Sequence, residues 1–235
     1  MMKKDYSLNG KITLESMSSA FWYNKWVFDL FNKYLSNTIL EVGCGNGNFT
    51  DKLAPFGNVY AIDIDRTLIA KTKQKIKKRA VVGFGDIEKG KFFFRNIKFD
   101  SIVCINVLEH IKNDDYALRN ITKLLKRNGI FILLVPSHQS LYGKIDEAIG
   151  HFRRYEKKII MNKIKRNKFK IIKMQHLNIL GGLGWFVSGR LLKNSTVSTK
   201  KMKLFDRIAP FILPIEKKLN IPFGTSILLV AKKIK

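Results

Sequence analysis

The chain has 235 residues, a length that suits one α/β domain with a sizeable core. Apolar residues make up 46% of it, which excludes a largely disordered protein. Lysine and arginine outnumber aspartate and glutamate by 44 to 18, so the net charge is +26. A charge of this size restricts the partners of a protein, and not its fold, because it favours anionic surfaces and ligands.

Three interpretations of this charge remain open: solvated lysine-rich helix faces without a partner, an anionic membrane surface, and nucleic acid bound through its phosphates. The two cysteines, Cys44 and Cys104, do not have the spacing of a disulfide framework or a metal cluster. The N-terminus lacks the apolar run of a signal peptide, and no long apolar stretch is free of charges and glycines. We therefore expect a cytoplasmic protein, with peripheral contact to the inner membrane face as an extension.

The first half of the chain alternates between apolar runs and helical periodicity. A leading helix is expected over 14–35, where the rings of Tyr23 and Trp26 either pack in the core or close over a ligand. A strand over 38–42 leads into a helix that begins near Asn48. The next strand spans 58–63, and Asp65 is expected to cap a helix over Arg66–Lys78.

The second half continues the pattern. Strands are expected over 80–84, 100–105, 129–135, 169–175 and 226–231, and helices over 114–127 and 156–167. Asn128-Gly129 is a typical end for the helix over 114–127. Alternating strands and helices predict an α/β fold, in which a doubly wound, mostly parallel sheet is covered by helices on both faces.

Residues 39–50 read Ile-Leu-Glu-Val-Gly-Cys-Gly-Asn-Gly-Asn-Phe-Thr, so a strand runs directly into a glycine-rich turn. Glycine lets a ligand approach the backbone closely, and the start of the following helix offers free N–H groups. The next strand ends at Asp63, twenty residues after Gly43, where such folds hold a ribose. The third glycine, Gly47, comes one residue too early for the dinucleotide fingerprint, which argues against an oxidoreductase.

With Glu41, this loop resembles motif I of the class I S-adenosylmethionine-dependent methyltransferases, and the resemblance continues over about residues 38–136 through Gly85-Asp86-Ile87 and Asn106–His110. It implies a seven-stranded Rossmann-like sheet in the order 3-2-1-4-5-7-6, with the last strand antiparallel. It also implies a single domain, with a leading helix in 1–36, a cofactor-binding core in 37–136, and an acceptor-binding half in 137–235. That half carries a helical insert over 177–222.

The same resemblance implies S-adenosyl-L-methionine as cofactor and S-adenosyl-L-homocysteine as product. Glu41 would hold the amino group, Asp63 the ribose, Asp86 and Ile87 the adenine, and Asn106 the sulfonium end. The full set of expected cofactor contacts is Glu41, Gly43, Cys44, Gly45, Gly47, Asp63, Ile64, Asp86, Ile87 and Asn106. Carboxylates in these positions can instead brace a loop or cap a turn, so that alternative stays open.

Residues 150–155 read Gly-His-Phe-Arg-Arg-Tyr, which resembles a group of bacterial and archaeal methyltransferases found beside glycosyltransferases or fused to them. The candidates for proton transfer or for facing the methyl group are His110, His151 and Tyr155. The candidates for acceptor binding are His138, Tyr142, Arg153 and Arg154. In the alternative interpretation, the arginines brace a loop and the Glu109-His110 pair braces a helix start. Some quinone methyltransferases bind metal through Glu-x-x-Glu-His, but Asn106 replaces the first acid, so no metal is expected.

These residues predict methyl transfer to a small-molecule, glycan or glycolipid acceptor, at oxygen. An apolar segment over 204–215 favours an acceptor held near a membrane, provided that the segment is exposed. RNA methylation is one alternative, although no Pro-Pro-aromatic run follows Asn106 and no RNA-binding module is recognisable. The other is a cofactor-binding regulatory protein without catalytic activity.

Overall fold

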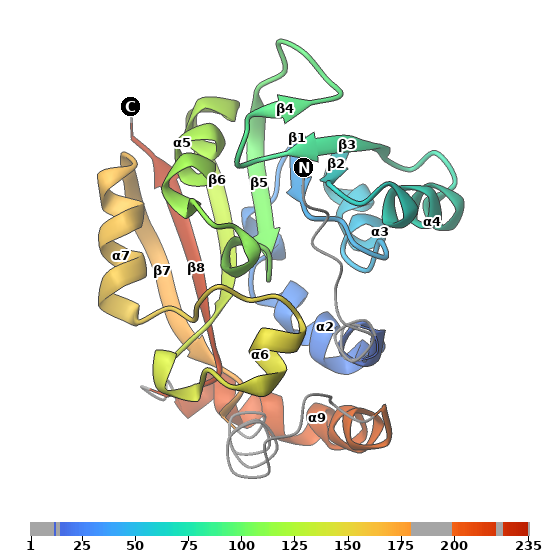
Figure 1. Cartoon of the computed structure of the whole chain (residues 1–235), viewed down its shortest axis with the longest axis vertical. Helices are drawn as coiled ribbons and strands as arrows, with labels where there is room; N and C mark the ends of the chain where they lie inside the picture. The colour runs from blue at the N-terminus through green and yellow to red at the C-terminus, as the bar shows by residue number, and fades with distance from the viewer. Residues whose placement is uncertain (1–11, 13–14, 180–198, 220–222, 235) are drawn as a thin grey trace.

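The computed structural model describes residues 12, 15–179, 199–219 and 223–234. Its centre is a single sheet of eight strands (Figure 1). The strands are β1 (Thr38–Val42), β2 (Asn58–Asp63), β3 (Val81–Asp86), β4 (Lys91–Phe92), β5 (Phe99–Ile105), β6 (Leu125–Pro136), β7 (Phe169–Leu177) and β8 (Ser226–Lys233). The predicted insert over 177–222 is described up to residue 179 and from 199 to 219, and the rest of it lies outside the described residues.

The strand order is β4-β3-β2-β1-β5-β6-β8-β7. Strands β3, β2, β1, β5 and β6 pair in parallel, whereas β8 pairs antiparallel with both β6 and β7. Apart from β4, this is the predicted order, and the antiparallel last strand is confirmed. The prediction of seven strands in total is wrong, because residues 91–93 fold back along β3 and form β4. Gly83 leaves room for the ring of Phe93, which a side chain at this position would meet.

Helices cover both faces of the sheet. They are α2 (Phe21–Asp29), α3 (Thr50–Leu53), α4 (Arg66–Ile76), α5 (Asp114–Leu124), α6 (Lys144–Ala148), α7 (Lys157–Arg166) and α9 (Thr199–Leu219). Short 3-10 turns add η1 (Asn32–Tyr34), η2 (Ala54–Phe56), η3 (Leu108–His110) and η4 (Gln139–Leu141).

Alternate residues of the central strands point to two separate cores, as expected for strands that are covered on both faces. In β6, Leu133 packs with α5 and α7, whereas its neighbours Ile132 and Leu134 pack with α2 and α3. A third cluster joins α4 to β2 and β3. These layers fix the carboxyl ends of the parallel strands along one edge of the sheet, which is where ligands bind in such folds.

The leading segment differs from the prediction of one helix over 14–35. Within the described residues, a helical turn over 15–18 ends before Ala20, whose ψ of 83° is not helical, and α2 then begins at Phe21. The carboxylate of Asp206 on α9 accepts hydrogen bonds from the backbone N–H groups of Trp22 and Tyr23, at 2.9 and 3.1 Å. A residue far along the chain therefore caps α2, and local periodicity could not reveal this.

Two other boundaries also differ. The helix expected from Asn48 begins at Thr50 and has only four residues. The helix expected to end at Asn128-Gly129 ends at Leu124, because Leu125 is already extended and pairs with Phe99. The cap of Asp65 is confirmed, since its side chain accepts hydrogen bonds from the N–H groups of Thr67 and Leu68.

Candidate active site

The candidate site begins in the turn between β1 and α3, at the carboxyl edge of the sheet (Figure 1). Gly43, Gly45 and Gly47 all have positive φ, at 78°, 50° and 71°. A Cβ on Gly43 would lie 2.3 Å from Cγ2 of Val107, so this position needs glycine for packing as well as for φ. A Cβ on Gly45 would meet no atom of the described residues within 4 Å. The loop therefore presents bare backbone to open space at Gly45, which fits the close approach of a ligand.

Asp63 lies at the end of β2, and its carboxylate holds the glycine loop in place. One oxygen accepts a hydrogen bond from the N–H of Gly45 at 2.9 Å, and the other accepts one from the N–H of Asp65 at 2.9 Å. Burial raises the pKa of Asp63, although these N–H groups act in the opposite direction. Each carboxylate oxygen can accept more than one hydrogen bond, so Asp63 retains the capacity to bind ribose hydroxyls.

Glu41 points away from solvent, with 4% of its surface exposed. Its carboxylate accepts a hydrogen bond from the hydroxyl of Thr50, the first residue of α3. Burial raises the pKa of Glu41 to about 8. The side chain thus braces the turn from the sheet into α3, as the alternative interpretation expected. A cationic group that approached it would favour its ionised form.

The other predicted cofactor contacts lie along the same edge. Asp86 ends β3 and accepts a hydrogen bond from the N–H of Lys89 at 3.0 Å, so it also caps a turn. Ile87 is 5% exposed and belongs to the core, whereas Ile64 is 62% exposed. Asn106 follows β5 with a φ of 53° and is exposed. The thiol of Cys44 is buried, which raises its pKa.

His151 is held by a buried ionic network after α6. Its Nδ1 lies 2.7 Å from Oδ1 of Asp146, which also accepts a hydrogen bond from Nε of Arg154 at 2.9 Å. Burial alone would raise the pKa of Asp146, but His151 and Arg154 outweigh it, and the pKa is lowered. Asp146 is therefore a carboxylate at neutral pH and can only accept hydrogen bonds. Nδ1 of His151 must carry the proton, so in the neutral ring Nε2 is the basic nitrogen.

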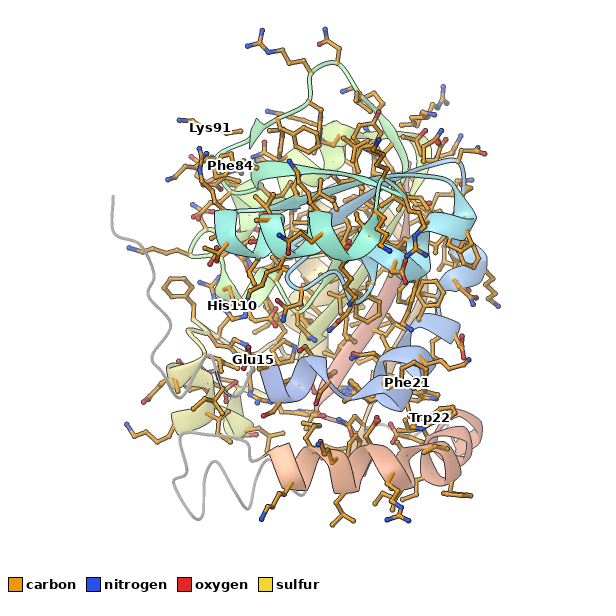
Figure 2. The ribbon with its side chains drawn as sticks, turned by 90° about the vertical axis from the view of Figure 1, so that its right-hand side faces the viewer. Glu15, Phe21, Trp22, Phe84, Lys91 and His110 are labelled. Carbon is orange, nitrogen blue, oxygen red and sulfur yellow. The ribbon has the colours of Figure 1, made fainter. Side chains whose placement is uncertain are left out.

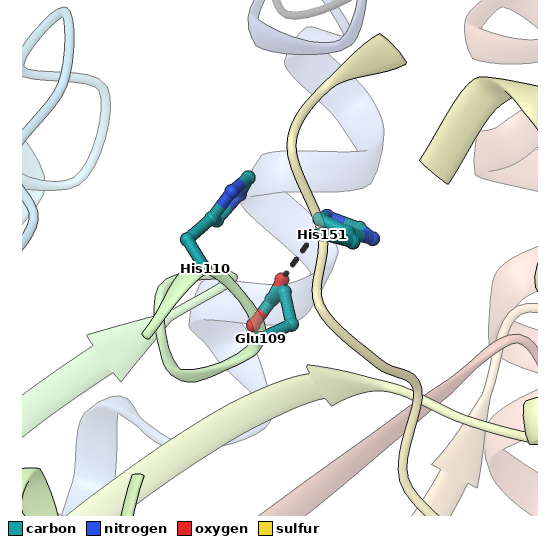
Figure 3. Close-up of side chains that lie close together, drawn as sticks. All are labelled: Glu109, His110 and His151. Atoms are coloured by element: carbon teal, nitrogen blue, oxygen red, sulfur yellow. Dashed lines mark ion pairs between the residues drawn. The ribbon is translucent and has the colours of Figure 1, made fainter. Parts of the chain in front are cut away.

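Glu109 and His110, on η3, face His151 (Figure 3). Nε2 of His151 lies 3.7 Å from Oε1 of Glu109, and the rings of His110 and His151 meet edge to face at 4.6 Å. Glu109 is fully buried, and its carboxylate oxygens accept no hydrogen bond from the described residues. Burial raises its pKa to about 8, so at neutral pH the carboxyl is mostly protonated. Ligand atoms of these three residues lie within 4.8 Å of one another, the kind of group that can hold a metal ion.

The loop over 106–110 connects this group to the glycine turn. Val107 packs against Gly43, where it leaves no room for a Cβ. The N–H of Phe152 donates a hydrogen bond to the carbonyl of Glu109 at 2.8 Å. The loop over 150–155 therefore packs directly on the segment that borders the glycine turn. The predicted cofactor and acceptor halves meet at η3.

Two of the predicted residues, Tyr155 and Arg154, are buried in structural roles, so those predictions are corrected. Arg153 also has structural partners but is partly exposed. Tyr155 is 1% exposed and donates a hydrogen bond to Asp114 at 2.9 Å, so its hydroxyl lies in the core and faces no acceptor. Arg154 is 5% exposed and is committed to Asp146 and to the carbonyl of Ser137. Arg153 forms an ion pair with Asp114 at 3.2 Å and donates to the carbonyl of Lys112. These contacts agree with the alternative interpretation, in which the arginines brace a loop.

The last two candidates border the same loop. Tyr142 donates a hydrogen bond to the carbonyl of His151 at 2.8 Å. The ring of His138 stacks between His176 and Phe223, at centroid distances of 5.1 and 4.5 Å. Sequence analysis missed Asp146, whose only sequence signal is a carboxylate five residues before His151. It also missed the His138 ring stack, which brings together positions far apart in the chain.

Comparisons with known proteins agree with this arrangement. Residues 40–133 match the family described as methyltransferase domain. The chain is 31% identical over 134 residues to the uncharacterized protein MJ0638 of Methanocaldococcus jannaschii, which covers 57% of this chain and 55% of that protein. It is 28% identical over 96 residues to the ubiquinone biosynthesis O-methyltransferase of Pelagibacter ubique, which covers 40% of each. The matches thus span about half the length of these relatives or less.

A solved structure extends the likeness to nearly the whole chain. The N-methyltransferase NodS of Bradyrhizobium japonicum, in complex with S-adenosyl-L-homocysteine, superposes with a TM-score of 0.59 over 91% of this chain and 86% of NodS. The identity is 16%, so this likeness concerns the fold. Residues 40–133 thus resemble a methyltransferase domain, and the fold of nearly the whole chain is shared with solved S-adenosylmethionine-dependent methyltransferases. None of the described helices has the length and apolar composition that would carry it across a bilayer.

Proposed function

We propose that this protein transfers the methyl group of S-adenosylmethionine to a hydroxyl oxygen of a small-molecule, glycan or glycolipid acceptor. The observation that supports it most directly is the buried network in which Arg154 and Asp146 hold His151 beside η3. A hydroxyl is a poor nucleophile until it loses its proton, whereas a neutral amine needs no base to attack. An imidazole held in one tautomer at the methyl-transfer end of the site therefore favours oxygen.

When bound, S-adenosylmethionine supplies a methyl group on a positively charged sulfur. Nε2 of His151 would accept the proton that the acceptor hydroxyl loses when its oxygen takes up the methyl group. Asp146 stabilises the imidazolium through its hydrogen bond to Nδ1, and Arg154 keeps Asp146 ionised. The protonated Glu109 carboxyl carries no charge that would compete for this proton at neutral pH. His110 borders the same ring and lines the acceptor.

For the cofactor we propose the arrangement that the residues predict. The bare backbone at Gly43, Cys44, Gly45 and Gly47 receives the amino-acid tail, and Glu41 takes its amino group. Asp63 binds the ribose with Ile64 beside it, Asp86 and Ile87 border the adenine, and Asn106 lines the sulfonium end. The open space at Gly45 and the free acceptor capacity of Asp63 support this assignment. His138 and Tyr142 are proposed to line the acceptor.

The relatives leave the methylated atom open, because one is named an O-methyltransferase and the structural neighbour an N-methyltransferase. We would incubate the protein with methyl-labelled S-adenosylmethionine and cell extract separated into lipid, water-soluble and RNA fractions. Label in a lipid or soluble product, stable to acid as an ether is, is the expected result. Label confined to RNA, or to an amine, would contradict the proposal.

The proposed role of His151 as a base can be tested together with that of Asp146, which positions its ring. We expect His151→Ala to lower kcat by roughly 100-fold or more, the range of a lost general base. Asp146→Asn removes the negative charge beside the ring and lowers the imidazole pKa, so the rising limb of the pH–rate profile should move to lower pH. Glu147→Gln, on the same helix but with a half-exposed side chain, is the matched control. If Asp146 only stabilised the fold, Asp146→Asn would lower the melting temperature and leave the pH–rate profile unchanged.

A further inference from the structure

Helix α9 carries apolar side chains on two opposite faces. Ala209 and Leu213 are buried against the domain, with 1% and 3% of their surfaces exposed. Leu204, Ile208 and Phe211 are 64%, 41% and 77% exposed. Their spacing of four and three residues places them in one stripe along the helix, on the side away from Ala209 and Leu213. A helix that only covered a domain would carry polar residues on that outer side.

The described charged side chains on the outer side of α9 are all basic. Lys200, Lys203 and Arg207 are exposed beside the apolar stripe, and within the described part of the chain none of them has an ion-pair partner. The two acids of the helix are used elsewhere. Asp206 accepts the N–H groups at the start of α2, and Glu216 accepts those of residues 178 and 179. The helix therefore withdraws its negative charges and presents cations and apolar groups.

Exposed aromatic residues lie next to α9. Phe21 and Trp22, the first residues of α2, are 55% and 45% exposed, and their rings meet edge to face at 5.3 Å. The backbone N–H of Trp22 donates a hydrogen bond to Asp206 of α9. Figure 2 shows Phe21 and Trp22 beside this helix. Tryptophan is enriched where a protein meets the bilayer interface. In Figure 1, β5 runs toward the end of the molecule at which α9 lies.

We infer that the outer face of α9, defined by Leu204, Ile208 and Phe211 with Lys200, Lys203 and Arg207 along its border, docks the protein on an anionic lipid bilayer. The apolar stripe enters the interface and the cations meet anionic headgroups. A second copy of the chain is a poor partner for this face, because two molecules of charge +26 repel each other. Docking here brings the edge that carries the candidate site toward the membrane. The inference does not depend on the proposed acceptor.

Flotation of the full chain with lipid vesicles tests this directly, and it needs no turnover. We expect the protein to float with phosphatidylcholine vesicles that contain about a third phosphatidylglycerol, to bind pure phosphatidylcholine at least tenfold more weakly, and to dissociate as salt is raised. Leu204→Ser with Phe211→Ser should weaken binding to the anionic vesicles by roughly tenfold or more, since both side chains are already exposed and little folding energy depends on them. Lys203→Gln with Arg207→Gln should weaken it as well.

Matched controls lie elsewhere on the surface. Ile159→Ser with Ile172→Ser removes two half-exposed apolar groups from α7 and β7, and Lys71→Gln with Lys73→Gln removes two exposed charges from α4. Neither pair should change binding, and circular dichroism melts check that all variants are folded. Equal binding of neutral and anionic vesicles, or an equal loss in the controls, would overturn the inference. So would a concentration-dependent dimer that Phe211→Ser abolishes, because the face would then bind a second copy.

Discussion

At the scale of single residues, the site depends on carboxyl groups whose environments differ. Asp146 is buried but paired with two cationic partners, so its pKa is lowered. In Glu41 and Glu109 burial outweighs the neighbouring hydrogen bonds and cations, and the pKa of each carboxyl is raised to about 8. Neighbouring groups with pKa values pushed in opposite directions are typical of functional sites. The same chemistry has a measurable consequence for stability.

Glu109 should make the folded state less stable as pH rises. Its pKa is raised from 4.5 in the unfolded chain to about 8, so the folded state binds its proton more tightly over that interval. The stabilisation is fully present below about pH 4.5 and is lost as pH rises through 8. Glu109→Gln cannot titrate, so its free energy of unfolding should fall less steeply between pH 5 and 8 in denaturant melts. Identical slopes for wild type and Glu109→Gln would contradict the burial of this carboxyl, and Glu147→Gln serves as the control.

At the scale of elements, two glycines of one loop should respond differently to alanine. Gly43→Ala places a Cβ against Val107 in a backbone with positive φ, so it should destabilise the protein by roughly 1–3 kcal/mol. Gly45→Ala has the φ strain but meets open space, so its stability cost should be smaller. Its main effect should be weaker binding of S-adenosylhomocysteine. Chemical denaturation and calorimetry separate the two, and equal affinity in Gly45→Ala and wild type would place the ligand elsewhere.

The contact between α2 and α9 is a second element-scale test. Asp206→Ala removes the acceptor for two N–H groups of α2, which should cost about 1 kcal/mol and lower the melting temperature by about 2–4 °C. Asp29→Ala, at the far end of α2, removes only a half-exposed ion pair with Lys25 and should change little. If both variants melt alike, Asp206 does not cap the helix.

The fold and the cofactor loop could be predicted because their determinants are local. The glycine turn and Asp63 lie within one strand–turn–helix–strand unit, and the cap of Asp65 needs only its own neighbours. The acceptor side could not be predicted as well. Whether Arg154 faces a ligand or Asp146, and whether Tyr155 faces a methyl group or Asp114, depends on burial that a sequence motif does not record. The cap of α2 by Asp206 spans more than 180 residues.

At the scale of the whole molecule, the two halves of the chain meet at η3. The segment over 106–110 contacts the glycine turn through Val107 and the loop over 150–155 through Glu109. This junction lies at the carboxyl edge of the sheet, with α2 and α9 beyond it (Figures 1 and 2). In the proposed arrangement, a cofactor in the glycine turn has its reactive end beside His110 and His151. All of the proposed chemistry requires that the cofactor occupies this turn.

Isothermal titration calorimetry with S-adenosylhomocysteine tests that requirement most directly. We expect the wild-type protein to bind one equivalent of the ligand saturably. Asp63→Ala should retain its fold and bind at least about tenfold more weakly, since a charged acceptor of two ribose hydroxyls is lost. An affinity of Asp63→Ala within about twofold of wild type, or no binding by the wild type, would contradict the central claim.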